Sequence, residues 1–150
     1  MGVMRTRAGL HLASLLVAGG ALALAGAPAS AASLAPPVIH EPFTVLPCPE
    51  NPQSTLAIEG CLEQRVIRGD HAIDGVSRVI FAKLRGTAAR SRFIAAQTTW
   101  LAFRRADCRS ISDVNEGGSL AGIDYLTCSV ARNTQRLSDL RSFRAALAHP

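Results

Sequence analysis

Residues 96–108 carry the polar and aromatic side chains best suited to binding or chemistry. Gln97, Trp100 and Arg104 follow one another at steps of three and four residues, so a helix places them on one side. An amide, an indole and a guanidinium in this arrangement can bind a partner through hydrogen bonds and stacking. The same side chains can instead join neighbouring helices, with Trp100 in the core and the two polar groups hydrogen-bonded inside. Both interpretations are open on the sequence alone, and partner binding is the functional prediction.

A second candidate for binding is the polar segment 113–119, Asp-Val-Asn-Glu-Gly-Gly-Ser. Its paired glycines suit turn conformations, and Ser119 suits the cap of a following helix. The segment lacks the lysine and the length of a phosphate-binding loop. We predict that Asn115, Glu116 and Ser119 contact a partner.

The sequence does not predict an enzyme. Catalysis would require a nucleophile with its base, two separated carboxylates in a cleft, or a set of metal ligands. Asp70 and Asp74 lie at helical spacing, which is typical of a solvated helix face. The cysteine spacings include no Cys-x-x-Cys pair. No catalytic residue, metal or cofactor is therefore predicted.

Residues 1–31 have the pattern of a signal peptide. Arg5 and Arg7 precede an uncharged run over residues 8–27, and an Ala-x-Ala site follows at residues 29–31. We predict cleavage after Ala31 and a secreted, periplasmic or cell-envelope location, with no stable membrane anchor after cleavage. An uncleaved anchor is the alternative, because the run is nearly long enough to span a bilayer.

Export favours disulfides over metal binding for the four cysteines. Four cysteines allow three pairings, and the sequence does not choose among them. Proximity in the chain favours Cys48 with Cys61 and Cys108 with Cys128, each contributing about 2–4 kcal/mol to stability.

Three stretches after a proline-rich segment show the spacing of amphipathic helices. Residues 32–51 contain five prolines and predict an extended arm. Apolar residues then recur at steps of three and four over 58–84, 93–103 and 123–147. The expected buried face of the second helix is Phe93, Ala96, Trp100 and Phe103. Three glycines weaken the first helix by up to about 1 kcal/mol each and predict a kink or a close crossing. They are Gly60, Gly69 and Gly75.

Signals for the helix ends lie between these stretches. Asn51 followed by Pro52 is expected to cap and open the first helix. Gly86 is expected to end it, and Thr87 to cap the second. Short connections indicate antiparallel neighbours. The sequence thus predicts an all-α fold over residues 52–150, an antiparallel hairpin bundle of about three helices stabilised by disulfides.

The charge of the chain is mildly basic. Of its 16 basic residues, two lie in the predicted signal peptide, which leaves 14 against 11 acidic residues, a net charge of +3. Arg104, Arg105 and Arg109 lie near a helix C-terminus, where cations interact favourably with the helix dipole. Nucleic acid is therefore not a predicted partner.

The second half of the chain carries a set of residues typical of one known family: Ala96-Gln97, Trp100, Phe103-Arg104, Cys108, Gly117-Gly118-Ser119, Cys128, Arg136 and Leu140. With them, residues 48–143 resemble the LprI-type lysozyme inhibitor N-terminal domain. In the first half Cys61, Asp70 and Ile73 fit the pattern of that family, whereas Asp74 and Ser77 stand where asparagine and tyrosine are expected. Asn133 replaces a usual threonine.

The resemblance implies an exported, disulfide-bonded helical domain of the bacterial cell envelope that blocks a lysozyme without being an enzyme. Lysozymes are commonly basic, and a chain at +3 would be steered away from them. An acidic patch would offset this, and Asp113, Glu116 and Asp124 are candidates for one. The alternative is a non-enzymatic envelope module that binds another exported protein or an anionic cell-wall polymer.

Overall fold

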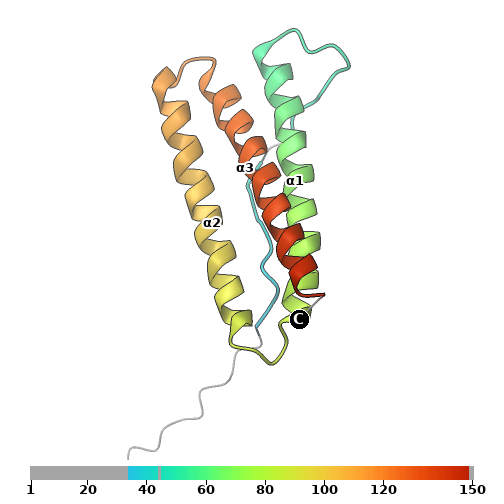
Figure 1. Cartoon of the computed structure of the whole chain (residues 1–150). Coiled ribbons are helices and arrows are strands. Elements are labelled where there is room, and N and C mark those ends of the chain that lie inside the picture. The colour runs from blue at the N-terminus through green and yellow to red at the C-terminus, as the bar shows by residue number, and fades with distance from the viewer. Residues whose placement is uncertain (1–33, 44, 149–150) are drawn as a thin grey trace, which may run out of the picture. The chain divides into compact units, whose positions relative to one another are not determined.

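A computed structural model describes residues 34–43 and 45–148 of the chain. The predicted signal peptide, residues 1–31, lies outside the described residues. No strand occurs in the described part, so the prediction of an all-α antiparallel bundle is confirmed (Figure 1). None of the described helices is long and apolar enough to cross a membrane. The elements are α1 (Thr55–Lys83), α2 (Ala89–Ser112), the 3-10 helix η1 (Asp113–Asn115) and α3 (Ala121–Ala146).

The first helix begins three residues later than the expected start at Pro52. Ser54 is extended and caps α1, because its hydroxyl accepts a hydrogen bond from the N–H of Ala57 at 3.2 Å. The prediction of Asn51 as the cap was wrong. The Asn51 side chain instead accepts a hydrogen bond from the side-chain amide of Gln53 at 2.7 Å, so its oxygen is used within the preceding loop.

The expected caps of α2 and α3 were also wrong. Thr87 donates its hydroxyl to the carbonyl of Leu84 at 2.8 Å, so it closes the end of α1 instead of opening α2. Ser119 precedes Leu120, the residue at the start of α3, which makes no side-chain capping bond. Gly86 does supply the expected turn, with a φ of 76° that favours glycine.

The buried face of α2 differs from the expected one. Phe93 is buried, but Ala96 is exposed and Phe103 is 52% exposed. The buried stripe continues instead through residues that recur at helical spacing: Gln97, Arg104 and Cys108. A polar stripe can face the interior when its groups find partners there, and the neighbouring helices supply those partners.

The apolar core lies toward the end of the bundle where α1 joins α2 and α3 ends (Figure 1). It draws on all three helices and on Ile39 of the arm. Its buried members are Ile73, Ile80, Phe81, Leu84, Phe93 and Leu140.

The segment before α1 is extended and runs along the helices (Figure 1). Carboxylates of α1 bind its backbone at two points: Asp74 accepts the N–H of Ile39 at 3.0 Å, and Glu63 accepts the N–H of Leu46 at 2.8 Å. Side chains of the helices, rather than a strand partner, therefore bind the backbone of the described part of this arm, and Gln64 and Arg105 add bonds to the carbonyls of Leu46 and His40.

Two disulfides are present, and both predicted pairings are confirmed. Cys48 joins Cys61, which ties the end of the arm to the second turn of α1. Cys108 joins Cys128, which ties the end of α2 to the start of α3. Both cross-links lie toward the end of the bundle that holds the α2–α3 connection.

The three glycines of α1 have different surroundings. A Cβ atom at Gly60 would lie 2.2 Å from the carbonyl oxygen of Pro47, and one at Gly69 would lie 2.8 Å from the Nδ2 atom of Asn133. A Cβ atom at Gly75 would meet nothing within 4 Å. The expected close approach therefore occurs at the first two glycines, where the arm and α3 reach the helix backbone.

Gly60→Ala and Gly75→Ala should consequently change stability in opposite directions. The first forces a methyl group against backbone and should lower the free energy of unfolding by about 1–3 kcal/mol. The second removes only the conformational freedom of glycine and should raise it by about 0.5–1 kcal/mol. Urea denaturation of both variants measures the difference, and equal effects would contradict the close packing of the arm.

Candidate functional site

The guanidinium of Arg104 is the centre of the buried polar interior. The residue is 1% exposed. It donates hydrogen bonds to Asp70 on α1, to Asn133 on α3, and to Glu41 on the arm at 2.8 Å. One side chain of α2 thus joins α1, α3 and the arm.

Asn133 extends this centre between α3 and α1. Its amide donates to Asp70 at 2.8 Å and to the carbonyl of Val66 at 3.1 Å, over the bare backbone of Gly69. The prediction that Asp70 and Asp74 mark a solvated face was wrong, because each is only 5% exposed. A carboxylate can be buried when cations and N–H donors face it, and both have such partners.

Gln97 and Trp100 form a second layer beside Arg104. Gln97 donates to the hydroxyl of Ser77 on α1 at 2.8 Å and accepts from Arg136 on α3 at 2.8 Å. The Trp100 ring lies 5.2 Å from the guanidinium of Arg104 and 5.6 Å from that of Arg136, within the range of cation–π attraction. The three side chains therefore hold the helices together.

The burial of Gln97 and Arg104 restricts what they can do. Their polar groups are bonded inside the bundle, and Trp100 is half-buried. The contacts are those of the helix-joining interpretation that the sequence left open. A direct role of these three residues in partner binding stays a prediction.

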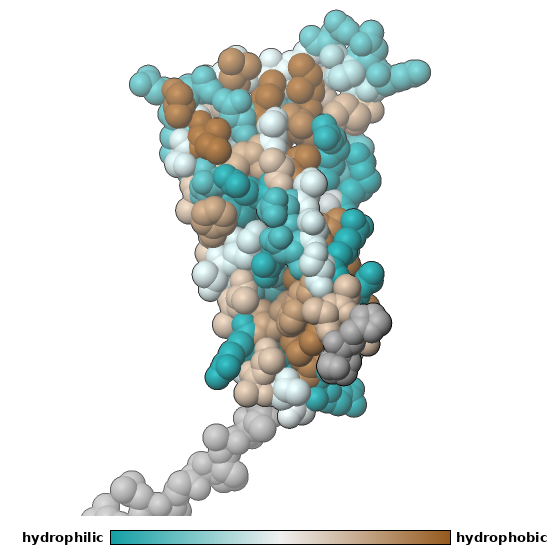
Figure 2. All heavy atoms as spheres, in the orientation of Figure 1, coloured by the Kyte–Doolittle hydropathy of each residue, from teal (hydrophilic) through white to brown (hydrophobic). Residues whose placement is uncertain are grey.

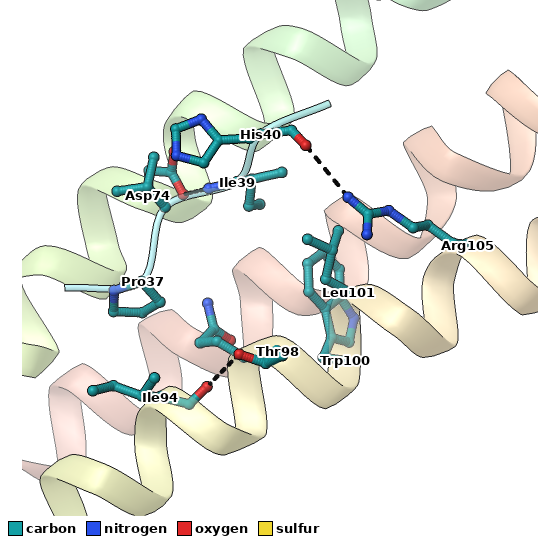
Figure 3. A pocket seen from close by; sticks show the side chains of 11 residues that line it. Pro37, Ile39, His40, Asp74, Ile94, Thr98, Trp100, Leu101 and Arg105 are labelled. Atoms are coloured by element: carbon teal, nitrogen blue, oxygen red, sulfur yellow. Dashed lines mark hydrogen bonds between the residues drawn. The ribbon is translucent and has the colours of Figure 1, made fainter. Parts of the chain in front are cut away.

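A cavity of about 290 Å³ lies beneath the arm and is mostly apolar. Figure 3 shows His40 and Asp74 on one side, with Trp100 and Leu101 across from them. Burial raises the pKa of Asp74 above its ordinary value, and the nearby Asp70 adds to the rise. The hydrogen bond from Ile39 opposes it, as do Arg78 and His71. The cavity can accept a small apolar group, and it presents a lone carboxyl rather than a catalytic pair.

The connection between α2 and α3 is held firmly at its base. Ser112 donates its hydroxyl to the carbonyl of Ala121 at 2.9 Å, and the side chain of Asn115 donates to Asp124. Glu116 adopts a left-handed backbone with a φ of 47° and is exposed, as is Ser119. Of the predicted loop residues, Glu116 and Ser119 therefore face solvent, and Asn115 shapes the turn.

Acidic residues gather at this end of the bundle, which we call the acidic end. The start of α1 meets the start of α3 there, since a Cβ atom at Gly122 would lie 2.2 Å from a carboxylate oxygen of Glu59. Arg109 lies near Glu59 and over the ring of Tyr125, so a cation is present among the described acids. The acidic end comprises Glu50, Glu59, Asp113, Glu116 and Asp124.

Exposed apolar side chains accompany these acids, and sequence analysis missed them. Val114 is 80% exposed, Leu120 is 54% exposed and Ile111 is 41% exposed. Figure 2 shows apolar side chains interspersed with hydrophilic ones at this end. The signal was available, since Val114 and Leu120 flank a polar turn and lie outside the predicted apolar stripes.

The family model described as "Lysozyme inhibitor LprI" matches residues 48–140. The chain belongs to the LprI family. The match includes both disulfides, Arg104 with its partners Asp70 and Asn133, and the whole acidic end. No curated protein and no solved structure matches the chain.

In this LprI domain, one acid lies beside cysteine sulfurs. Asp107 is close to Cys108 and Cys128, but those two sulfurs are bonded to each other and are not available as metal ligands. Asp107 instead pairs with Arg132 at 2.7 Å. The group is therefore part of the cross-link between α2 and α3.

Arg104→Gln should lower the free energy of unfolding by about 3–5 kcal/mol, because it leaves buried carboxylates without their cation. Arg105→Gln is the matched control. Arg105 also pairs with Glu41, at 3.0 Å, but its own side chain is 47% exposed. The control should cost less than about 1 kcal/mol. Chemical denaturation compares the two, and a similar loss for both would contradict the central role of Arg104.

Asp74→Asn should stabilise the domain at neutral pH. A raised pKa means that the folded state holds the proton more tightly than the unfolded state, so stability falls as pH rises from about 4 through the folded pKa. Asparagine removes this loss and retains an oxygen for the N–H of Ile39. Denaturation between about pH 4 and pH 8 should show an advantage of the variant that grows with pH. An advantage that shrinks with pH would show that the carboxylate is stabilised in place.

Proposed function

We propose that this LprI-family chain is an exported lysozyme inhibitor that binds the enzyme through its acidic end. In this proposal residues 1–31 direct export and are removed, and the inhibitor acts in the cell envelope or outside the cell. Membership of the family supports inhibition rather than catalysis. Binding of another exported protein through the same surface is the alternative.

The distribution of charge is the observation that carries the proposal. Glu41, Glu63, Asp70 and Asp74 are buried inside the bundle. The acids that face solvent therefore concentrate at the acidic end, although the net charge is positive. Commonly basic lysozymes would be attracted to this end by complementary charge, which speeds association.

Exposed apolar residues on the same surface can stabilise the complex with a lysozyme once it has formed. Interfaces bury a less polar centre within a polar rim. Ile111, Val114 and Leu120 can supply that centre, and Asp113 and Glu116 the rim. In this arrangement the hydroxyl of Ser119 can donate to the carboxylates that line a glycosidase cleft, while the acids contact basic groups around it.

The turn is also preorganised, which favours tight binding because little freedom is lost on association. The disulfide between Cys108 and Cys128 joins the two helices beneath it. The hydrogen bonds from Asn115 to Asp124 and from Ser112 to Ala121 fix its ends.

Glu116→Asn should slow association with a basic lysozyme by roughly 3- to 10-fold at low ionic strength, with a smaller effect at high salt. Asparagine tolerates the left-handed backbone at this position, so the turn is kept while the charge is lost. The control is Asp139→Asn, which removes an exposed carboxylate on the last turns of α3 at the opposite end.

Association rates come from surface plasmon resonance, and protection of a lysozyme-sensitive cell suspension reports inhibition. The control should associate as fast as the unaltered protein. The absence of protection by the unaltered protein in large excess would reject the proposed function. Equal slowing by both substitutions would reject the acidic end as the binding surface.

A further inference from the structure

The end of the bundle opposite the acidic end is strongly basic. It is formed by the end of α1, the start of α2 and the end of α3 (Figure 1). Asp139 is the exposed acid among the described residues there, and Asp74 is buried. None of the basic residues forms an ion pair with another described residue. This basic end comprises Arg78, Lys83, Arg85, Arg90, Arg92, Arg141 and Arg144, of which Arg90 alone is half-buried and the others are exposed.

Helix dipoles explain only part of this cluster. Lys83 and Arg144 lie in the last turns of α1 and α3, where a cation is favourable. Arg90 and Arg92 lie at the start of α2, where a cation is unfavourable, and the first turn contains no acid to offset them. Arg90 lies 3.8 Å above the ring of Phe81, and its Nε atom is buried without a hydrogen-bond partner. Arg90 and Arg92 therefore do not stabilise α2 through its dipole.

Exposed apolar side chains lie next to these cations in the chain. Val79 on α1 directly follows Arg78 and is 41% exposed, and Phe143 on α3 directly precedes Arg144 and is 39% exposed. A groove of about 440 Å³ between α2 and α3 adds a largely apolar surface, and Arg92 and Phe143 are among the residues that line it. Figure 2 shows apolar and hydrophilic side chains mixed at this end of the molecule.

We propose that the basic end docks reversibly on an anionic lipid bilayer. Arginines can bind lipid phosphates while aromatic and aliphatic side chains enter the boundary between headgroups and acyl chains, and this combination is typical of surfaces that lie on membranes. Binding of a soluble polyanion would require only the charges. It would not explain why Val79 and Phe143 are exposed beside them. The apolar component therefore favours a bilayer over a wall polymer.

Docking in this way would also orient the molecule. The 29 residues of α1 separate the two ends by about 40 Å. An anionic bilayer attracts the basic end and repels Asp113 and Glu116, so the acidic end would point into the aqueous compartment. The described part of the arm begins at the basic end (Figure 1).

Vesicle sedimentation tests the proposal with protein isolated after export. The vesicles contain phosphatidylcholine with phosphatidylglycerol, or phosphatidylcholine alone. We expect binding to the anionic vesicles, loss of binding with added salt, and little binding to the neutral ones. The triple variant Arg85→Gln, Arg92→Gln and Arg144→Gln should bind the anionic vesicles roughly 100-fold more weakly, at about fivefold for each cation near the surface.

A second triple variant has the same change in net charge at other positions: Arg65→Gln, Arg68→Gln and Arg109→Gln. All three arginines are exposed, and none belongs to the basic end. This control should bind within about threefold of the unaltered protein, because its charges lie away from the contact. Equal losses for the two triples would show a general effect of net charge and would overturn the proposal.

Val79→Ser separates a bilayer from a soluble polyanion. The substitution keeps every charge and should weaken binding to anionic vesicles by about 3- to 10-fold, because apolar surface no longer enters the interface. Binding to soluble polyphosphate should not change. Unchanged vesicle binding by Val79→Ser would overturn the bilayer proposal in favour of a polyanion. The assay contains no lysozyme, so its outcome is independent of the proposed inhibition.

Discussion

The burial of the Arg104 guanidinium is the constraint on which the rest of the structure depends. A charge taken out of water is tolerated only when its partners are in place, because the desolvation penalty is several kcal/mol. Here the acceptors come from the arm, α1 and α3, through Glu41, Asp70 and Asn133. No segment can slide along another without leaving a buried charge unpaired, so this contact fixes the register of the bundle.

The pairing of charges in the interior affects the distribution of charge on the surface. Four carboxylates face inward to bind Arg104 or the backbone of the arm: Glu41, Glu63, Asp70 and Asp74. Most of the acids left outside lie at one end, where Asp139 is not found, and seven cations that form no ion pair with another described residue lie at the other. A chain with a modest net charge thereby acquires two ends of opposite sign. The inward pairing of these carboxylates therefore both holds the bundle together and leaves the surface charges on which the proposed contacts depend.

The sequence predicted the helices and both disulfides because these depend on local spacing and proximity in the chain. It did not predict which face of α2 is buried. Hydrophobic periodicity considers only apolar side chains and therefore predicts Phe103 on the buried face. Arg104 is buried instead because it pairs with Glu41, a residue 63 positions away. The same long-range pairing buried Asp70, which local spacing had placed on a solvated face. For the candidate site, the sequence indicated Glu116 and Ser119, but the exposed Val114 and Leu120 depend on how the turn folds.

The two ends are also stabilised in different ways. The apolar cluster around Ile80, Phe81 and Phe93 lies near the basic end, whereas both disulfides lie toward the acidic end. A domain of this size has one modest core, and cross-links can replace packing where that core does not reach. The acidic end therefore depends more on its disulfides, and so on an oxidising compartment, whereas the opposite end depends more on hydrophobic packing. A surface proposed to bind a lysozyme would thus reach its rigid form where disulfides persist, outside the cytoplasm.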